Sequence, residues 1–318
     1  MKLTLDDVAA AAVRIAPYVL KTPALIHETS GATLCIKPEC LQPIGAFKLR
    51  GAFNMMLQLP DDCPGVVAHS SGNHAQAVAR AARVLGISAI IVMPSDAPPN
   101  KRARVLQDGA TVVEVGTDSE ERRIKADEIA AATGRTLVPP YDHVAIAAGQ
   151  GTAALELFDD CGDLARFYAP VSGGGLMAGC ATAIAAKCPG VEIIGVEPAD
   201  ANDTQLSLGS GKRELVPPPS TIADGLRVRT PGKGPWPILR THLSRVEVVS
   251  DEELLETIAW ALINLRIVLE PSGAASLAVA LREAESGSGN WGVLLSGGNI
   301  HPQHWPDVAA RAQRLSPT

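Results

Sequence analysis

Residues 65–93, GVVAHSSGNHAQAVARAARVLGISAIIVM, decide the class of fold. Residues 65–69 and 89–93 are short apolar runs, and a helix-length segment at 73–85 separates them. Two buried strands joined through a helix are typical of a parallel sheet that helices cover on both faces. A polar loop at residues 70–72 joins the first strand to the helix. The stretch therefore predicts an α/β fold.

The same alternation extends outward over most of the chain. Its 318 residues suit about two domains. A stretch rich in proline, glycine and serine, 207–237, breaks the pattern, and the polar tail after Trp305 is expected to contribute little. Further strands are expected at 33–36, 111–115, 191–196 and 291–295. Further helices are expected at 5–20, 98–107, 119–133, 251–267 and 272–283, and one more begins near residue 47. Residues 166–187 are expected to form a strand, a loop and a helix.

Composition excludes several classes of partner. The net charge is −6 and the basic residues are scattered, which does not suit a phosphate backbone, so no nucleic acid is expected. The N-terminus carries acids where a signal peptide needs basic and then apolar residues, and no apolar stretch is long enough to span a membrane. The six cysteines show neither a Cys-x-x-Cys pair nor a zinc spacing, so they are interpreted as reduced thiols. A soluble cytoplasmic protein fits best.

Lys48 lies beside Phe47 at the mouth of a strand–loop–helix unit. A free lysine, with a pKa of about 10.4, is a poor base at neutral pH. Burial near other cations, or an imine with an aldehyde cofactor, makes it a useful nucleophile and proton carrier. Taken alone, the string FKLR fits the start of an amphipathic helix whose Lys48 and Arg50 face solvent. The other polar loops of the chain favour the chemical interpretation.

A glycine-rich turn, Ser172-Gly-Gly-Gly-Leu176, follows a strand and opens a helix. Glycines let backbone N–H groups converge, and a helix N-terminus adds about half a positive charge, so the turn predicts a phosphate cradle. The spacing is neither G-x-G-x-x-G nor that of a nucleotide P-loop. Close packing of the helix on the strand is the structural alternative.

Two further polar loops follow strands. Ser70, Ser71, Asn73 and His74 fall within a few residues of one another, and residues 296–299, SGGN, follow the last strand. Ser71 or Asn73 alone also suits a helix N-cap. Because open α/β sheets bind ligands at the carboxyl ends of their strands, these loops, the glycine turn and Lys48 are expected to converge on one crevice.

These motifs resemble the fold-type II pyridoxal-phosphate (PLP) enzymes, and within them the serine/threonine dehydratase and serine racemase group. The likeness runs from about residue 5 to 299 through seven ordered motifs, at 37–52, 70–77, 148–152, 172–176, 221–225, 270–274 and 296–299. It implies two open, twisted, mostly parallel sheets of the tryptophan synthase β type. It also implies an active site in the cleft between a large domain (1–55 and 143–318) and a small one (56–142).

The resemblance implies a role for each cofactor residue. Lys48 forms the imine, Phe47 packs on the ring, and Asn73 bonds the 3′-oxygen. A serine hydroxyl facing the ring nitrogen does not hold that nitrogen fully protonated, which suits elimination over transamination. Ser172 stands where relatives usually carry glycine. The implied cofactor-binding residues are Phe47, Lys48, Asn73, Ser172, Gly173, Gly174, Gly175, Leu176, Glu270 and Ser296.

The same resemblance implies the substrate contacts. The loop at 70–74 clamps the substrate α-carboxylate, and Ser71 is a second catalytic acid/base across the cofactor from Lys48. Tyr141 lies at the cofactor edge, where relatives carry other residues. Arg122 meets a second substrate carboxylate, although a solvated helix charge is the plainer interpretation. The implied substrate-binding residues are Ser70, Ser71, Asn73, His74, Tyr141 and Arg122.

Residues 197–203, EPADAND, resemble the divalent-cation loop of the racemase-like branch. Two carboxylates, Glu197 and Asp203, with the carbonyl of Ala201, are oxygen ligands that suit Mg²⁺ or Ca²⁺. Without the resemblance, two acids after a strand are more often simply solvated. The sequence therefore leaves the metal site as a hypothesis.

The expected reaction is β-elimination from L-serine, L-threonine or 3-hydroxyaspartate, which gives a 2-oxo acid and ammonia. An amino acid racemase, with or without dehydratase activity, is the alternative, and a non-catalytic PLP or amino-acid binder is more distant. An NAD-dependent oxidoreductase is weaker still, because the fingerprint spacing is absent. The resemblance also implies a homodimer, and no effector domain is expected after residue 318.

Overall fold

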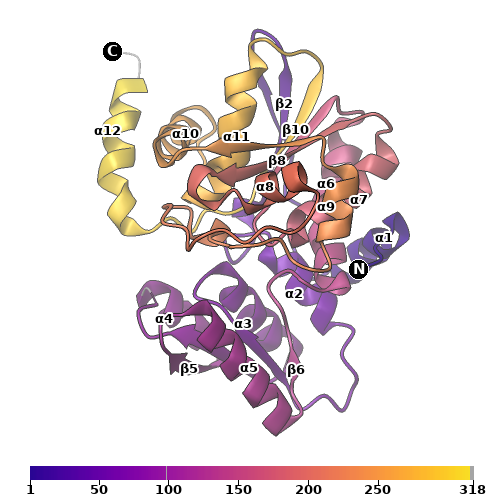
Figure 1. The fold of residues 1–318 in the computed structure, drawn as a ribbon, viewed down its shortest axis with the longest axis vertical. Coiled ribbons are helices and arrows are strands. Elements are labelled where there is room, and N and C mark those ends of the chain that lie inside the picture. The colour runs from indigo at the N-terminus through magenta and orange to yellow at the C-terminus, as the bar shows by residue number, and fades with distance from the viewer. Residues whose placement is uncertain (98, 316–318) are drawn as a thin grey trace.

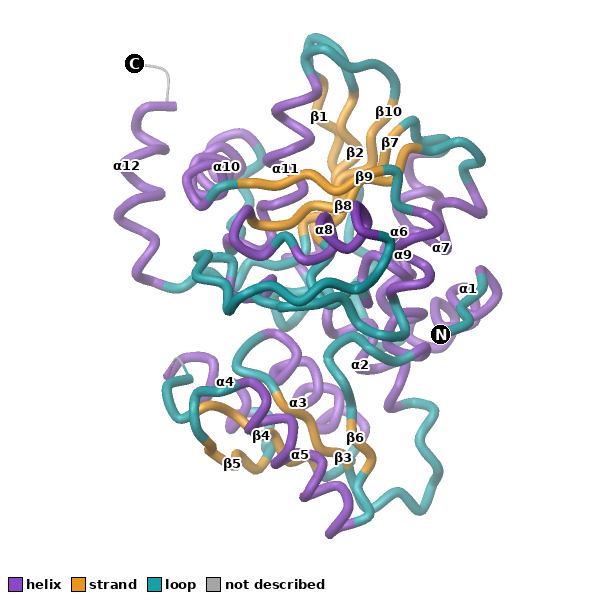
Figure 2. Tube along the Cα trace, in the orientation of Figure 1, coloured by secondary structure: helices purple, strands orange, loops and turns teal. Residues whose placement is uncertain are grey.

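The computed structural model describes residues 1–97 and 99–315, which form two sheets with helices on their faces (Figures 1 and 2). The larger sheet has six strands in the order β1-β2-β10-β7-β8-β9, and only β1 and β2 pair in antiparallel fashion. Its strands are β1 (Leu25–Glu28), β2 (Thr33–Pro38), β7 (Arg166–Pro170), β8 (Glu192–Pro198), β9 (Arg245–Val249) and β10 (Asn290–Leu295).

The smaller sheet has four strands in the order β5-β4-β3-β6, all of them parallel. They are β3 (Val66–His69), β4 (Ala89–Pro94), β5 (Thr111–Val115) and β6 (Thr136–Leu137). The predicted mostly parallel α/β fold is therefore confirmed. The exact domain boundaries, at 55/56 and 142/143, stay a prediction.

Twelve α-helices and four short 3₁₀ turns occur in the described residues. The helices are α1 (Leu5–Ile15), α2 (Lys48–Met56), α3 (Asn73–Leu85), α4 (Pro99–Gln107), α5 (Ser119–Thr133), α6 (Val144–Cys161), α7 (Gly175–Lys187), α8 (Asp203–Ser210), α9 (Trp236–His242), α10 (Asp251–Asn264), α11 (Pro271–Ala284) and α12 (Trp305–Leu315). The 3₁₀ turns are η1 (Glu39–Leu41), η2 (Ala199–Ala201), η3 (Asp224–Leu226) and η4 (Pro302–His304). The structure shows no helix, in the parts of the chain it describes, that is long and apolar enough to cross a bilayer.

Strand periodicity divides the core of the larger sheet into two layers. Along β10, Val293 and Leu295 point into the layer that α10 and α11 cover, whereas Leu294 points into the layer that α6 and α7 cover. Successive strand residues face opposite sides of a sheet, so near-continuous apolar runs are needed where both faces are buried. In the smaller sheet, Val66 packs on the side of α2 and α3, and Val67 on the side of α5.

Helix α6 was not predicted, because its glycine-rich run has low intrinsic helix propensity. Tertiary packing requires those glycines. A Cβ on Gly149 would lie 2.7 Å from the carbonyl oxygen of Arg50, and one on Gly151 would lie 2.6 Å from that of Gly179. Helix α6 therefore lies directly against α2 and α7, and it connects the start of α2 to the larger sheet.

The prediction that the tail contributes little was wrong. Residues 305–315 form α12, whose Val308 is fully buried and whose Ala312 is nearly so. Both side chains pack into the core layer of α10 and α11, because the apolar residues of this mostly polar segment fall on one helical face. Strands β1, β6 and β9 were also missed, and residues 207–210 continue α8 rather than forming a loop.

Candidate active site

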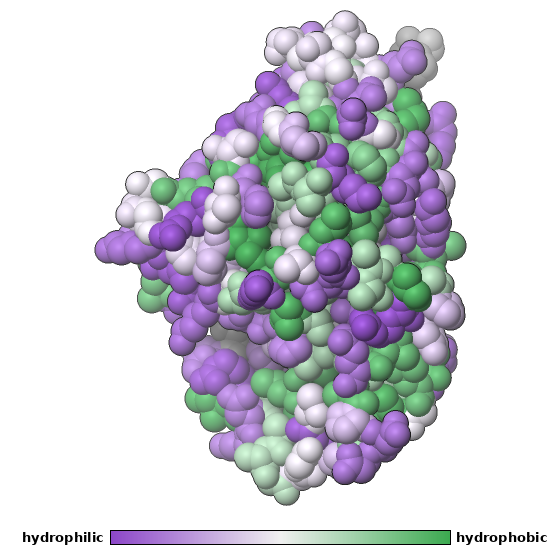
Figure 3. All heavy atoms as spheres, turned by 90° about the vertical axis from the view of Figure 1, so that its right-hand side faces the viewer, coloured by the Kyte–Doolittle hydropathy of each residue, from purple (hydrophilic) through white to green (hydrophobic). Residues whose placement is uncertain are grey.

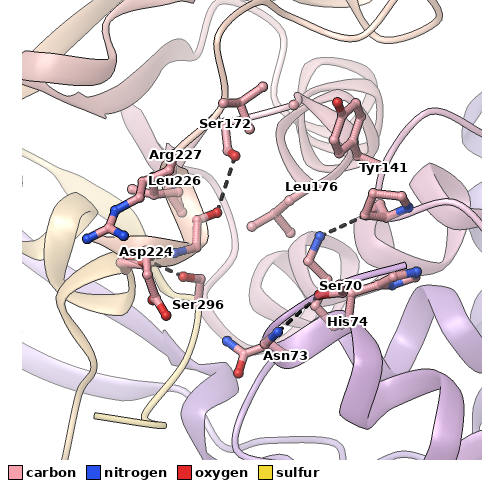
Figure 4. Close-up of a pocket in the computed structure, with 18 of the residues that line it drawn as sticks. Ser70, Asn73, His74, Tyr141, Ser172, Leu176, Asp224, Leu226, Arg227 and Ser296 are labelled. Atoms are coloured by element: carbon pink, nitrogen blue, oxygen red, sulfur yellow. Dashed lines mark hydrogen bonds between the residues drawn. The ribbon is translucent and has the colours of Figure 1, made fainter. Parts of the chain in front are cut away.

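A cavity of about 180 Å³ lies between the two sheets (Figure 4). Its wall is built by loops that follow β3, β7 and β10, and by the first residues of α2. The carboxyl ends of parallel strands are where open α/β sheets bind ligands. Every residue that the sequence predicted for the cofactor lines this cavity, together with Ser70, Ser71, His74 and Tyr141.

The side chain of Lys48 enters the cavity from the N-terminus of α2. Its Nζ donates a hydrogen bond to the carbonyl oxygen of Pro140 at 2.7 Å and lies 5.1 Å from the centre of the Phe47 ring. Burial lowers the pKa of Lys48 to about 8, because the ammonium loses water without gaining a carboxylate partner. An appreciable fraction of the amine is therefore neutral and nucleophilic near neutral pH.

A buried charge network holds the turn of helix that carries Lys48. The guanidinium of Arg50 donates to Glu39 through Nε at 2.7 Å and to Glu156 through Nη1 at 2.7 Å. Lys37 forms an ion pair with the same Glu156 carboxylate, at 2.7 Å. Arg50 and Glu39 are fully buried, so the alternative in which Lys48 and Arg50 face solvent is wrong. The network anchors α2 to β2 and α6.

The glycine turn packs too closely for side chains. A Cβ on Gly173 would lie 2.4 Å from the Tyr141 ring, and Gly174 has a φ of 88°. The first N–H groups of α7 have no partner within the helix, so the turn presents donors and a partial positive charge to the cavity. Ser172 is one of two non-glycine residues with positive φ in the described residues, at 54°, and its Oγ donates to Gly225 O at 3.2 Å.

One cavity thus combines a lysine amine of lowered pKa with a helix N-terminus whose residues 173–175 pack too closely for any side chain. Helix N-termini of this kind are suited to bind anions. An aldehyde that carries a phosphate group has these two functions at its two ends. The residues present therefore fit PLP, with Lys48 at the aldehyde and the 172–176 turn at the phosphate.

A polar chain of hydrogen bonds lines the cavity floor. The Nδ2 of Asn73 donates to Glu270 at 2.6 Å, and the Nδ2 of Asn299 donates to Asn73 Oδ1 at 2.8 Å. The pKa of Glu270 is raised, first by burial and then by the nearby charge of Asp224. Ser296 donates to the carbonyl oxygen of Ser272 at 3.2 Å, which leaves its oxygen lone pairs free to accept. The orientation of the Asn73 amide is consequently fixed from both ends.

The loop after β3 supplies the remaining polar groups. Ser70 Oγ accepts the N–H of Gly72 at 3.1 Å, and Ser71 lines the cavity. Burial, together with the charge of Lys48, lowers the pKa of His74 to about 3, so its ring is neutral at pH 7. Its Nε2 lies 2.8 Å from the carbonyl oxygen of Val138 and must therefore carry the proton.

Arg122 lies away from the cavity lining. Its Nη1 donates to the carbonyl oxygen of Thr117, two residues before the start of α5, at 2.8 Å. The structure therefore does not bring this residue together with Lys48 and the glycine turn, and its role in substrate binding stays a prediction.

Glu197 and Asp203 form a buried pair beside η2, outside the cavity lining. Glu197 accepts the N–H groups of Thr204 and Gln205 at 3.0 to 3.2 Å, whereas both carboxylate oxygens of Asp203 lack a hydrogen-bond partner among the described residues. Burial raises the pKa of both carboxyls, and the charge of Asp203 raises that of Glu197 further. No cluster of three or more His, Cys, Asp or Glu side chains suited to a metal occurs in the described part of the chain.

Three charged residues of the cavity lining were missed by the sequence interpretation. Lys101, on α4, forms an ion pair with Asp224 at 2.5 Å, and Arg227 follows η3 in the same loop. Asp224 lies in the quoted motif at 221–225, which was a signal that the loop belongs to the site. Nothing near Lys101 in the sequence distinguishes it from the other charges of its helix.

The fold and this cavity define a PLP-dependent enzyme of fold type II, and the chain belongs to the family described as pyridoxal-phosphate dependent enzyme, whose model matches residues 14–297. Among curated proteins, it is 40% identical over 304 residues to the L-threo-3-hydroxyaspartate ammonia-lyase of Saccharomyces cerevisiae, with 93% of each chain covered. It is also 40% identical to the serine racemase of Schizosaccharomyces pombe, covering 93% of this chain and 94% of that one.

Solved structures show the same likeness. The structure of maize serine racemase superposes with a TM-score of 0.92 at 36% identity, covering 99% of both chains. The family assignment made from seven sequence motifs is therefore confirmed.

Proposed function

We propose that the protein is a PLP-dependent ammonia-lyase that acts on a β-hydroxy amino acid and releases a 2-oxo acid and ammonia. The observation that carries the proposal is the position of Lys48: its amine, with a pKa of about 8, shares one cavity with the glycine turn. The names of the relatives, an ammonia-lyase among them, support the reaction class. L-Serine, L-threonine and 3-hydroxyaspartate are the candidate substrates.

Each residue of this chain has a physical task in that reaction. PLP, when bound, supplies an electron sink for the negative charge left by removal of the substrate α-proton. Lys48 Nζ takes that proton, which its lowered pKa permits near neutral pH. Ser70, Ser71, Asn73 and His74 hold the α-carboxylate, and Tyr141 closes the cavity above the glycine turn.

Racemisation is the second candidate function, because Ser71 is a hydroxyl in the cavity wall and serine racemases are among the relatives. A racemase needs a second group that gives a proton to the face opposite Lys48, and we assign that task to Ser71. Retained L-to-D conversion in the Ser71→Ala variant would remove Ser71 from that role while leaving the lyase proposal intact.

A divalent cation, Mg²⁺ or Ca²⁺, is part of the proposal. Glu197 and Asp203 would bind it with the backbone carbonyl of Ala201. The two partnerless oxygens of Asp203 support this, because a buried carboxylate needs a proton, a donor or a cation. A cation there would stabilise η2 and the start of α8, which follow β8 in the chain.

Two further parts of the proposal concern the cell and the assembly. We infer that the protein is a cytoplasmic homodimer. Each subunit would consist of a large domain, residues 1–55 with 143–318, and a small domain, residues 56–142. The face shown in Figure 3 carries several hydrophobic patches among hydrophilic residues. Val13 on α1 is 80% exposed. Light scattering of the purified protein measures the mass in solution, and a monomer would contradict the dimer.

A substrate panel tests the main proposal. The purified protein should be yellow, lose that colour with borohydride, and release ammonia from at least one β-hydroxy amino acid. Turnover of 3-hydroxyaspartate well above that of threonine, lost in Arg122→Gln, would support a second-carboxylate role for Arg122. A yellow protein that releases no ammonia and interconverts no enantiomers would instead be a binder.

A further inference from the structure

A second cavity lies behind the wall of the first. Its volume is about 220 Å³, compared with about 180 Å³ for the first. The two cavities share Lys101, Asp224, Arg227 and Glu270, and the second is completed by the segment after β10, including His301 and His304. Of the residues that line only the second cavity, the site described above uses Asn299, whose Nδ2 donates to Asn73.

Arg227 lines the second cavity and forms no ion pair among the described residues. Its Nε donates to the carbonyl oxygen of Thr221 at 2.7 Å, which fixes the guanidinium on the loop. Within residues 1–97 and 99–315, no carboxylate forms an ion pair with it, so its Nη groups are available to a ligand. In Figure 4 the guanidinium points away from the side of the first cavity where Tyr141 and His74 lie.

The other polar groups differ in availability. Asp224 is already paired with Lys101 at 2.5 Å, and Glu270 already accepts a hydrogen bond from Asn73 at 2.6 Å. The Nδ1 of His301 accepts the N–H of Gln303 at 3.3 Å, which leaves Nε2 to carry a proton and act as a donor. A guanidinium fork and an imidazole N–H, with the nearby acids already engaged, favour an anionic ligand.

We propose that the second cavity binds a small carboxylate, with Arg227 as the bidentate donor and His301 as a further donor. A guanidinium matches the two oxygens of a carboxylate in one plane, and such charge-assisted pairs are the stronger hydrogen bonds of proteins. The volume admits a molecule of a few non-hydrogen atoms. The inference rests on the cavity and its charges, and it stands whichever reaction the first cavity performs.

A carboxylate bound in the second cavity would weaken substrate binding in the first. A carboxylate at Arg227 adds a negative charge beside Lys101, which lies in the shared wall and competes for it with Asp224. The Lys101–Asp224 pair joins α4, beside the smaller sheet, to η3, beside the larger one. Occupation of the second cavity therefore weakens a contact that closes the first, and the KM for the amino acid substrate rises.

The test uses the PLP-loaded protein and propionate, a carboxylate without an amine. Titration calorimetry measures binding, and the cofactor absorbance reports ligands that enter the first cavity. We expect propionate to bind without a change in that absorbance, Arg227→Gln to weaken binding about tenfold or more, and His301→Gln to weaken it severalfold. Arg229→Gln is the matched control: its Nε also donates to a backbone carbonyl, that of Val216, but it lines neither cavity.

Three outcomes would overturn the proposal. The first is the absence of propionate binding to the unaltered protein. The second is binding that survives His301→Gln and changes the cofactor absorbance, which means that the ligand occupies the first cavity. The third is tighter binding of inorganic phosphate than of propionate, because the site would then not be a carboxylate site.

Discussion

The guanidinium of Arg50 lies 2.7 Å from the carboxylate of Glu39, in a fully buried pair two residues from Lys48. The pair spans from η1, after β2, to α2, and Glu156 on α6 completes it. Removing one partner of a buried ion pair leaves the other charge uncompensated, which is strongly destabilising. This contact therefore holds the first turn of α2, and with it the lysine, against the larger sheet.

Removing Arg50 should consequently destabilise the protein strongly. We expect Arg50→Ala to lower the free energy of unfolding by about 3–5 kcal/mol, since the fully buried Glu39 carboxylate would lose its ion-pair partner and Glu156 would keep only Lys37. Denaturant unfolding of the cofactor-free protein measures the change. Arg102→Ala, which breaks an exposed pair with Glu114, is the control and should cost no more than about 1 kcal/mol. Equal effects of the two substitutions would contradict the anchoring role.

The charge on Lys48 should lower the free energy of unfolding of the cofactor-free protein at neutral pH. Its folded pKa, about 8, lies below the ordinary value, so folding disfavours the ammonium at pH values below 8. The cost disappears as the pH rises from 8 toward the ordinary pKa of about 10.4. Lys48→Met should therefore abolish turnover and stabilise the cofactor-free protein at pH 7 by up to about 3 kcal/mol. The gain should shrink above pH 8, and a gain that grows with pH would contradict the assigned shift.

Gly173 tests the glycine turn. A Cβ at this position meets the Tyr141 ring at 2.4 Å, so Gly173→Ala must displace either the ring or the turn. We expect a loss of PLP affinity of tenfold or more, measured by equilibrium dialysis, with partial recovery in the Gly173→Ala, Tyr141→Ala double variant. Gly209→Ala, where nothing lies within 4 Å of the added Cβ, is the control and should retain affinity. Affinity that is unchanged in Gly173→Ala would separate the turn from the cofactor.

The buried Glu197–Asp203 pair predicts that the stabilising effect of a divalent cation depends on pH. Both folded pKa values are raised by burial, so the penalty for ionising the pair grows as the pH rises above about 4, the ordinary carboxyl range. The chelated protein should accordingly melt at a lower temperature near pH 8 than near pH 6. Mg²⁺ or Ca²⁺ should raise the melting temperature most at the higher pH.

Asp203→Asn is the matched variant for that experiment. It removes one charge at nearly constant volume, so it should stabilise the chelated protein near pH 8 and abolish the response to the cation. A response that survives this substitution would place the cation elsewhere.

Local patterns in the sequence determined most of the elements. The α3, α5 and β5 spans agree with the prediction residue for residue, because an amphipathic or apolar period together with its capping residues is a local property. The same holds for the lysine and the glycine turn, whose chemistry is set by the residue types. In α6, close packing against neighbouring helices outweighs the low helix propensity of its glycines. In α12, burial of Val308 and Ala312 stabilises a helix in a segment that is mostly polar.

What the sequence determined by itself was the alternation of strands and helices, the family, and which residues we propose to bind PLP. The tertiary structure alone decided which charges meet. Lys101 and Asp224 are 123 positions apart, and they pair only because α4 and η3 come together across the cleft. The lowered pKa of Lys48 and the raised pKa values of Glu197 and Asp203 likewise arise from burial, which depends on every segment packed around them and not on the residues beside them in the chain.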